Sequence, residues 1–234
     1  MSSSSRFVDL SHPLNANTQI YPGDPPFTMT PHATHERDAY CVHRLALGTH
    51  TGTHIDAPLH FVSGGRAVSA IPLAACVGTP LVVDLSADGL QPREPIAWAR
   101  LASHVDGALL GGDGARIVLI NTGWAAAYYG TPAYLAHPYL LPEVAETLFA
   151  RGVALVGTDT LSPDETPAEG AEGAHAFGFH ERFLGAGGVI AENLTNLEAL
   201  IAAQRAGGRW IVNLVPLRLD GADGSPVRAF AHSL

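Results

Sequence analysis

The sequence predicts an α/β protein with a mostly central β-sheet. Short apolar runs alternate along the 234 residues with segments of helical character, and the chain has no internal repeat. Several of these runs are continuously apolar, as expected for strands that are covered on both faces. Apolar residues make up 47% of the chain and charged residues only 15%, which is enough for one large core. We therefore expect a single domain that spans residues 1–234.

Eight segments have the β-branched and apolar composition of strands. In chain order they are residues 7–10, 42–47, 50–56, 81–85, 117–121, 153–157, 210–219 and 227–231. The sequence DGADGSP at 220–226 separates the last two and predicts a hairpin turn between them.

Three helices are predicted, over residues 95–105, 142–151 and 194–204. The first two begin with proline, which fits the first helical position because the N–H that it lacks would have no partner there. Gly152 fits the residue after the second helix. The acidic segment 162–173 is poor in apolar residues, and it is either a mobile lid over a site or a solvated connector.

The stretch GTHTGTHIDAPLH at 48–60 carries three histidines and an aspartate on even positions. Its glycine, proline and β-branched residues argue against a helix. In an extended strand, His50, His54 and Asp56 would share one face. Gly52 would lie between the histidines and leave room for an ion or a substrate. Two imidazoles and a carboxylate form a normal ligand set for zinc, manganese or iron, whereas ordinary polar residues of a half-buried strand are the plainer alternative.

A second histidine and carboxylate pair, His180 and Glu192, is separated by a glycine-rich break. Gly185 and its glycine neighbours exclude one continuous helix, so His180 would end one segment and Glu192 would start the next helix. The pair could hold a second ion with Asp56 as the bridge. Alternatively, Glu192 is only an acid favoured at a helix N-terminus.

Composition excludes several classes of function. The formal charge of −9 argues against nucleic acid and against an anionic membrane as partners. The absence of lysine excludes Schiff-base chemistry and the P-loop lysine. With two cysteines the chain offers neither a disulfide framework nor a cysteine-rich zinc module, and no signal-peptide or membrane-spanning pattern is found. We expect a cytoplasmic protein.

These motifs together resemble a known family. GTHTGTHIDAPLHF is similar to the signature of the cyclase-like metal-dependent hydrolases, which include bacterial kynurenine formamidases and isatin hydrolases. The resemblance covers nearly the whole chain, through VDLSHPL, YPGDPPF, INTGW, GVALVGTDTLSPD, HERFLGAGGVIAENLTNL and VPLRLDGADGSPVRA. It implies a swivelling β/β/α domain that assembles as a homodimer or homotetramer.

The resemblance also implies roles for particular residues. The implied metal ligands are His50, His54, Asp56, His180 and Glu192, which would bind one or two zinc or manganese ions per chain with Asp56 as the bridge. His60 would be the catalytic proton shuttle. Tyr21 stands where the formamidase pattern has a substrate-contacting tryptophan, and it would bind the aromatic substrate together with Phe61.

The implied reaction is attack of metal-activated water on a small aromatic amide. The expected activity is that of an arylformamidase, which converts N-formyl-L-kynurenine to L-kynurenine and formate. An alternative within the family is opening of a lactam or lactone ring, as in isatin hydrolysis, or a polyketide cyclase activity. A non-catalytic metal-binding protein is a remote alternative, because structural zinc sites are usually closed by four ligands, frequently cysteines.

Overall fold

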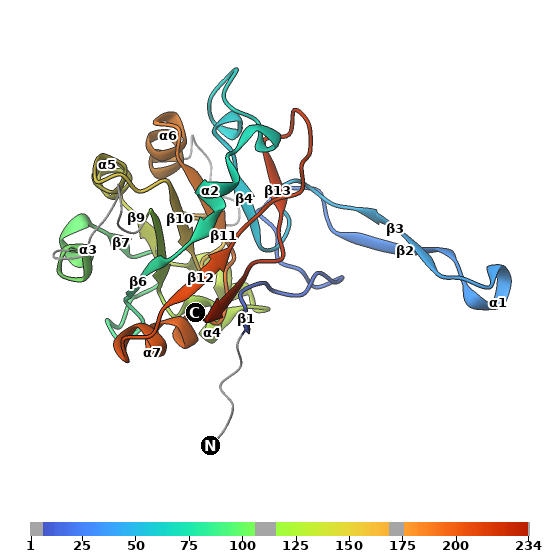
Figure 1. The fold of residues 1–234 in the computed structure, drawn as a ribbon, viewed down its shortest axis with the longest axis horizontal. Coiled ribbons are helices and arrows are strands. Elements are labelled where there is room, and N and C mark those ends of the chain that lie inside the picture. Colours follow the sequence, from blue (N-terminus) through green and yellow to red (C-terminus); the bar gives the residue numbers. More distant parts are fainter. Residues whose placement is uncertain (1–6, 106–115, 169–175, 234) are drawn as a thin grey trace.

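Two sheets and a layer of helices make up the body of the molecule (Figure 1). The computed structural model describes residues 7–105, 116–168 and 176–233. The larger sheet has six strands in the order β13 (Gly224–Pro226), β4 (His54–Asp56), β11 (Val189–Glu192), β10 (Leu155–Thr158), β8 (Ile117–Asn121) and β6 (Pro80–Asp84). The smaller has four, in the order β1 (Phe7–Asp9), β14 (Phe230–Ser233), β12 (Trp210–Asn213) and β5 (Val77–Gly78). The predicted α/β fold with a central sheet is confirmed.

The remaining elements connect or cover these sheets. The longer helices are α3 (Trp98–Val105), α5 (Pro142–Ala150), α6 (Gly178–Gly185) and α7 (Leu197–Arg205), and the short ones are α1 (His35–Asp38), α2 (Leu73–Cys76) and α4 (Trp124–Tyr128). The strands β7 (Pro95–Ile96) and β9 (Tyr139–Leu140) pair with each other, and 3-10 turns lie at Pro58–His60, Val68–Ala70 and Pro132–Ala136. Among the described helices, none has the length and apolar composition that a bilayer crossing requires.

The period-two pattern of the central strands explains the layers. In β8, Ile117 and Leu119 enter the core that faces the smaller sheet and α7, whereas Val118 and Ile120 enter the core under α3, α5 and α6. Both faces of this strand are therefore buried, as its continuous apolar sequence predicts. Strands β6, β8, β10 and β11 run parallel, while β4 and β13 pair antiparallel at one edge.

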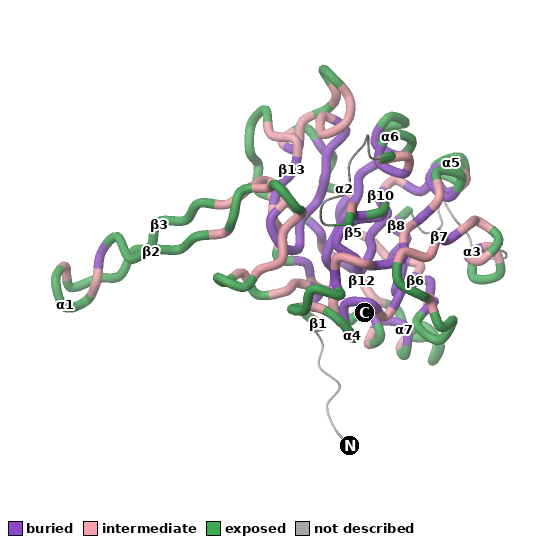
Figure 2. Tube along the Cα trace, turned by 180° about the vertical axis from the view of Figure 1, so that it is seen from behind, coloured by how far each residue is buried: buried purple, intermediate pink, exposed green. Residues whose placement is uncertain are grey.

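One hairpin leaves the body altogether. Strands β2 (Thr28–Ala33) and β3 (Val42–Ala46) form a two-stranded arm with α1 at its tip (Figure 2). Every residue of β3 is exposed, and the segment forms a strand as its sequence predicts, but outside the two main sheets. An isolated two-stranded ribbon is only marginally stable in water, so this arm is a candidate for contact with another chain.

Some predicted boundaries are wrong. The helix predicted from residue 95 begins at Trp98, because Pro95–Ile96 pairs as β7, and the helix predicted from residue 194 begins at Leu197. The strand predicted over 210–219 ends at Asn213. The predicted hairpin at 220–226 is also wrong, since Gly224–Pro226 is itself an edge strand that pairs with β4.

Candidate metal centre

The histidine motif reaches the site from a turn and a short strand, and the prediction of one continuous strand is wrong. Only His54–Asp56 forms β4, whereas His50 and Gly52 lie in the turn before it. Gly52 has a φ of 65°, and a Cβ there would collide with the side chain of Leu14. Glycine is therefore required by the backbone conformation and by the contact with Leu14, rather than by the approach of an ion.

Sheet register brings Glu192 to the motif. In the antiparallel β4–β11 pair, His54 lies opposite Glu192 and Asp56 lies opposite Ile190. Residues opposite each other in a sheet project to the same face, and Ile190 enters the core under the helices. His54, Asp56 and Glu192 thus point to the helical side of the sheet. Glu192 ends β11, so the prediction that it starts a helix is wrong.

His180 comes from the helix above this face. It lies near the start of α6 rather than at the end of a segment, which corrects the prediction, while the predicted break at Gly185 coincides with the end of that helix. Asp164 holds this arrangement, because its carboxylate accepts hydrogen bonds from the backbone N–H groups of Phe179 and His180 at 2.8 and 2.9 Å. An acid at a helix N-terminus is favoured by the helix dipole.

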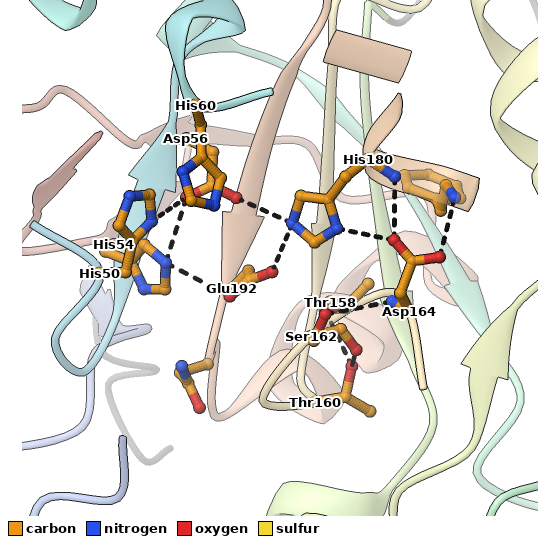
Figure 3. A network of polar contacts seen from close by, with 12 residues as sticks. His50, His54, Asp56, His60, Thr158, Thr160, Ser162, Asp164, His180 and Glu192 are labelled. Atoms are coloured by element: carbon orange, nitrogen blue, oxygen red, sulfur yellow. Dashed lines mark hydrogen bonds and ion pairs between the residues drawn. The ribbon is translucent and has the colours of Figure 1, made fainter. Parts of the chain in front are cut away.

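The five predicted ligands meet around Asp56 (Figure 3). Asp56 Oδ1 lies 2.7 Å from His50 Nδ1 and 3.2 Å from His54 Nε2. Asp56 Oδ2 lies 3.4 Å from His180 Nε2, which is also 3.2 Å from Glu192 Oε1. Glu192 Oε2 lies 3.2 Å from His54 Nε2. Two sets of three ligand atoms therefore share Asp56, namely His50, His54, Asp56 and Asp56, His180, Glu192.

Hydrogen bonds leave lone pairs directed at this point. His54 Nδ1 lies 2.8 Å from the Gly52 carbonyl, which can only accept, so Nδ1 carries a hydrogen and Nε2 is the nitrogen that a bound ion could use. His180 Nδ1 donates in the same way to Asp164 Oδ2 at 2.7 Å. Partners of this kind fix the tautomer of a metal-bound histidine.

Buried polar atoms at the centre lack hydrogen bonds. His54 Nε2, Asp56 Oδ2 and Glu192 Oε1 are buried without a hydrogen-bond partner in the described residues. Buried polar atoms are normally satisfied, so unsatisfied atoms that converge within a few ångströms fit a bound cation. The atoms that would coordinate the cation are all histidine nitrogens or carboxylate oxygens, which both zinc and manganese accept as ligands.

The electrostatics agree with this fit. Burial alone would lower the pKa of His54, but the Asp56 and Glu192 carboxylates outweigh it and raise the pKa to about 10. Burial likewise acts against the charged form of His50, and Asp56 and Asp223 raise its pKa to about 9. The carboxylates thus create an electrostatic field that favours positive charge at the site. Without an ion, protons on His50 and His54 supply that charge, and a divalent ion would displace these protons when it binds.

His60 lies beside the candidate ligands and contacts Asp223, a residue that the sequence did not indicate as part of the site. Its Nδ1 is 3.1 Å from Asp223 Oδ2, which also lies 2.9 Å from His50 Nε2. The His60 and His50 rings stack at 3.9 Å between centroids. Burial lowers the pKa of His60, and the attraction of Asp56 offsets this only in part. A neutral His60 that donates Nδ1–H to Asp223 keeps Nε2 free to accept a proton.

A cavity of about 200 Å³ adjoins the ligands. Its lining residues are Tyr21, Asp24, His50, His60, Phe61, Ser162, Phe177, His180 and Glu192. Tyr21 and Phe61, predicted from the resemblance to bind substrate, both line it. Burial, together with the carboxylates of Glu192 and Asp164, raises the pKa of Tyr21 to about 12, so its hydroxyl stays a hydrogen-bond donor.

Five residues of the site and its cavity were not predicted: Asp24, Ser162, Asp164, Phe177 and Asp223. Asp164 falls in the segment 162–173 that we interpreted as a lid or connector, and it is buried against His180. Residues 169–173 of that segment lie outside the described residues, so the lid remains an expectation. Asp223 falls in the segment predicted as a turn. Its motif DGADG predicts a local turn, but it does not indicate that Asp223 contacts His50 and His60, which are distant along the chain.

The chain is similar to known proteins over nearly its whole length. The family model described as "Putative cyclase" matches residues 8–165. A kynurenine formamidase from Bacillus cereus is 32% identical over 228 residues, with 96% of each chain covered. Another from Salinibacter ruber is 30% identical over 224 residues and covers 95% of each chain.

Solved structures show the same similarity in three dimensions. Isatin hydrolase A from Ralstonia solanacearum superposes with a TM-score of 0.80 at 26% identity, covering 96% of this chain and 90% of its own. A predicted metal-dependent hydrolase from Bacillus stearothermophilus gives a TM-score of 0.70 at 25% identity, covering 96% and 97%.

Proposed function

Since the chain belongs to the cyclase family and is a hydrolase of that family, we propose that its site hydrolyses an aryl formamide, with N-formyl-L-kynurenine as the preferred substrate. One observation carries the proposal: His60, whose pKa is lowered by burial, borders the same cavity as the five converging candidate ligands. The cavity also offers aromatic rings for an aryl group, from Tyr21, Phe61 and Phe177.

The proposed reaction adds water across the formyl C–N bond. One proton must leave the attacking water, and one must reach the aniline nitrogen as the bond breaks to give formate and the free amine. His60 Nε2 can take the first and deliver the second, because Asp223 fixes the ring through Nδ1. When bound to His50, His54, Asp56, His180 and Glu192, zinc or manganese supplies Lewis acidity toward the carbonyl and the water.

The decisive experiment compares the stripped protein with protein reloaded with zinc or manganese. Stripped protein is expected to be inactive, and reloaded protein is expected to hydrolyse N-formyl-L-kynurenine with a kcat/KM of roughly 10⁴ M⁻¹s⁻¹ or more. The metal content of each sample should be measured alongside. Binding of two ions without hydrolysis would contradict the substrate, whereas full activity without metal would contradict the site.

Isatin should be assayed in parallel as the second candidate substrate. The structural similarity to isatin hydrolase A favours it, since the same attack on an amide carbonyl would open the lactam ring. Efficient hydrolysis of isatin with none of the formamide would replace the first proposal with this one.

We propose further that the protein forms a homodimer or homotetramer in which a second copy of this chain covers the β2–β3 arm. We also propose that the protein is cytoplasmic. Met29 and Leu45 lie opposite each other on the arm and are 54% and 55% exposed. Light scattering is expected to show a dimer or tetramer, and Leu45→Arg is expected to shift it toward monomer. Leu73→Arg, at an exposed residue outside the arm, is the control. A monomeric parent protein would contradict the proposal.

A further inference from the structure

One charged residue of the cavity has no part in the metal centre. Asp24 is half-buried and lines the cavity with the aromatic residues and the histidines. Its backbone N–H donates to the Tyr21 carbonyl at 3.0 Å, and Gly23 adopts a φ of 98°. This turn fixes the position of Asp24 next to Tyr21.

The Asp24 carboxylate differs from the other acids around the site. Asp56, Asp164, Glu192 and Asp223 all lie against histidines. In the described part of the chain, no hydrogen bond or ion pair reaches the carboxylate of Asp24. A half-buried carboxylate that is unpaired in a ligand cavity is best satisfied by a cationic group of the ligand.

The cavity lacks the opposite kind of partner. Its described lining residues include no arginine, and the chain contains no lysine. A carboxylate on the substrate would therefore lie near Asp24 with no arginine or lysine to receive it, since the histidines of the cavity already lie against the carboxylates of Asp223 and Glu192. Like charges at close range select against a ligand as effectively as attractive contacts select for one.

We propose that Asp24 is a specificity residue that binds an ammonium group on the side chain of an aryl formamide and disfavours a substrate whose only charged group is a carboxylate. This inference rests on the proposed function and adds the charge class of the substrate to it. The aryl formamide end lies toward the ligands, and the ammonium end lies toward Asp24.

A matched set of formamides tests the proposal. The probes share an ortho-formamidophenyl ketone: ring-formylated kynuramine carries an ammonium, ortho-formamidoacetophenone is neutral, and 3-(2-formamidobenzoyl)propionic acid carries a carboxylate. We expect kcat/KM to fall in that order, with about tenfold between the cationic and neutral probes. Equal rates for all three, or a preference for the acid, would overturn the proposal.

Asp24→Asn keeps the shape of the side chain and removes its charge. The ratio of kcat/KM for the cationic probe over the neutral probe is expected to fall by about tenfold in this variant, mainly through KM. Asp88→Asn removes an exposed charge outside the cavity and should leave the ratio unchanged. An equal loss on every probe would assign Asp24 a structural role and overturn the proposal.

Calorimetry separates this inference from the proposed reaction. Kynuramine is expected to bind metal-loaded protein more tightly than ortho-aminoacetophenone does, and Asp24→Asn should remove the difference. If this holds while no formamide is hydrolysed, the proposed reaction fails and the charge selection stands. If formamides are hydrolysed but Asp24→Asn leaves both preferences intact, the charge selection fails alone.

Discussion

Replacing Asp56 by alanine is expected to abolish metal binding and hydrolysis together. Asp56 is fully buried, and its two oxygens lie within reach of His50, His54 and His180. Burial disfavours its charge, but the surrounding histidines hold its pKa well below the usual range. Without this carboxylate the two ligand sets lose the residue that they share. The site also loses a negative charge that would balance the positive charge of a bound ion.

The expected magnitudes are large. Metal affinity should fall by more than about 100-fold, and kcat/KM by about 10³-fold or more. Elemental analysis after dialysis measures the first quantity and a formamidase assay the second. Circular dichroism should be recorded for each variant to check that the fold is kept. If alanine disturbs the fold, Asp56→Asn serves as a second variant, because it keeps the side-chain volume and removes the charge. Full metal occupancy in both variants would rule out Asp56 as a bridging ligand.

Replacing His60 by alanine is expected to separate catalysis from metal binding. His60 belongs to neither of the two ligand sets that share Asp56, but it lines the cavity next to them. Its removal should leave metal content unchanged and lower kcat by about 10²- to 10⁴-fold, the usual contribution of general acid–base catalysis. His104→Ala, at an exposed position on α3, is the matched control.

Two results would contradict this role. If His60→Ala kept its turnover, proton transfer would have to lie elsewhere. If it lost its metal along with its activity, the histidine would be a ligand, as its proximity to His50 and Asp223 permits. In that case the Asp223–His60 contact would serve metal binding rather than proton transfer.

The local sequence was enough to indicate the candidate ligands and to predict several elements of the fold. His50, His54 and Asp56 lie within seven residues, so their convergence depends on a short piece of backbone. Strand β8 was predicted with its observed bounds, because five consecutive apolar and amide residues buried on both faces leave a clear pattern. The α5 helix likewise begins at the predicted Pro142.

The tertiary structure decided which distant residues complete the site. Asp223 reaches His50 from 173 residues away, and Asp164 reaches His180 from a loop after β10. Neither contact can be predicted from the periodicity of the sequence, because each depends on the order of strands in the sheet and on the packing of α6 above it. The register that sets Glu192 opposite His54 is decided in the same way.

The sequence by itself therefore determined the chemistry of the candidate ligands and the class of the fold, because side-chain type and strand or helix preference are local properties. Only the tertiary structure determined the partners that orient those ligands and the charge of the cavity beside them. The physical reason is that hydrogen bonds and electrostatic fields depend on distance in space, and the order of the strands sets that distance independently of separation along the chain.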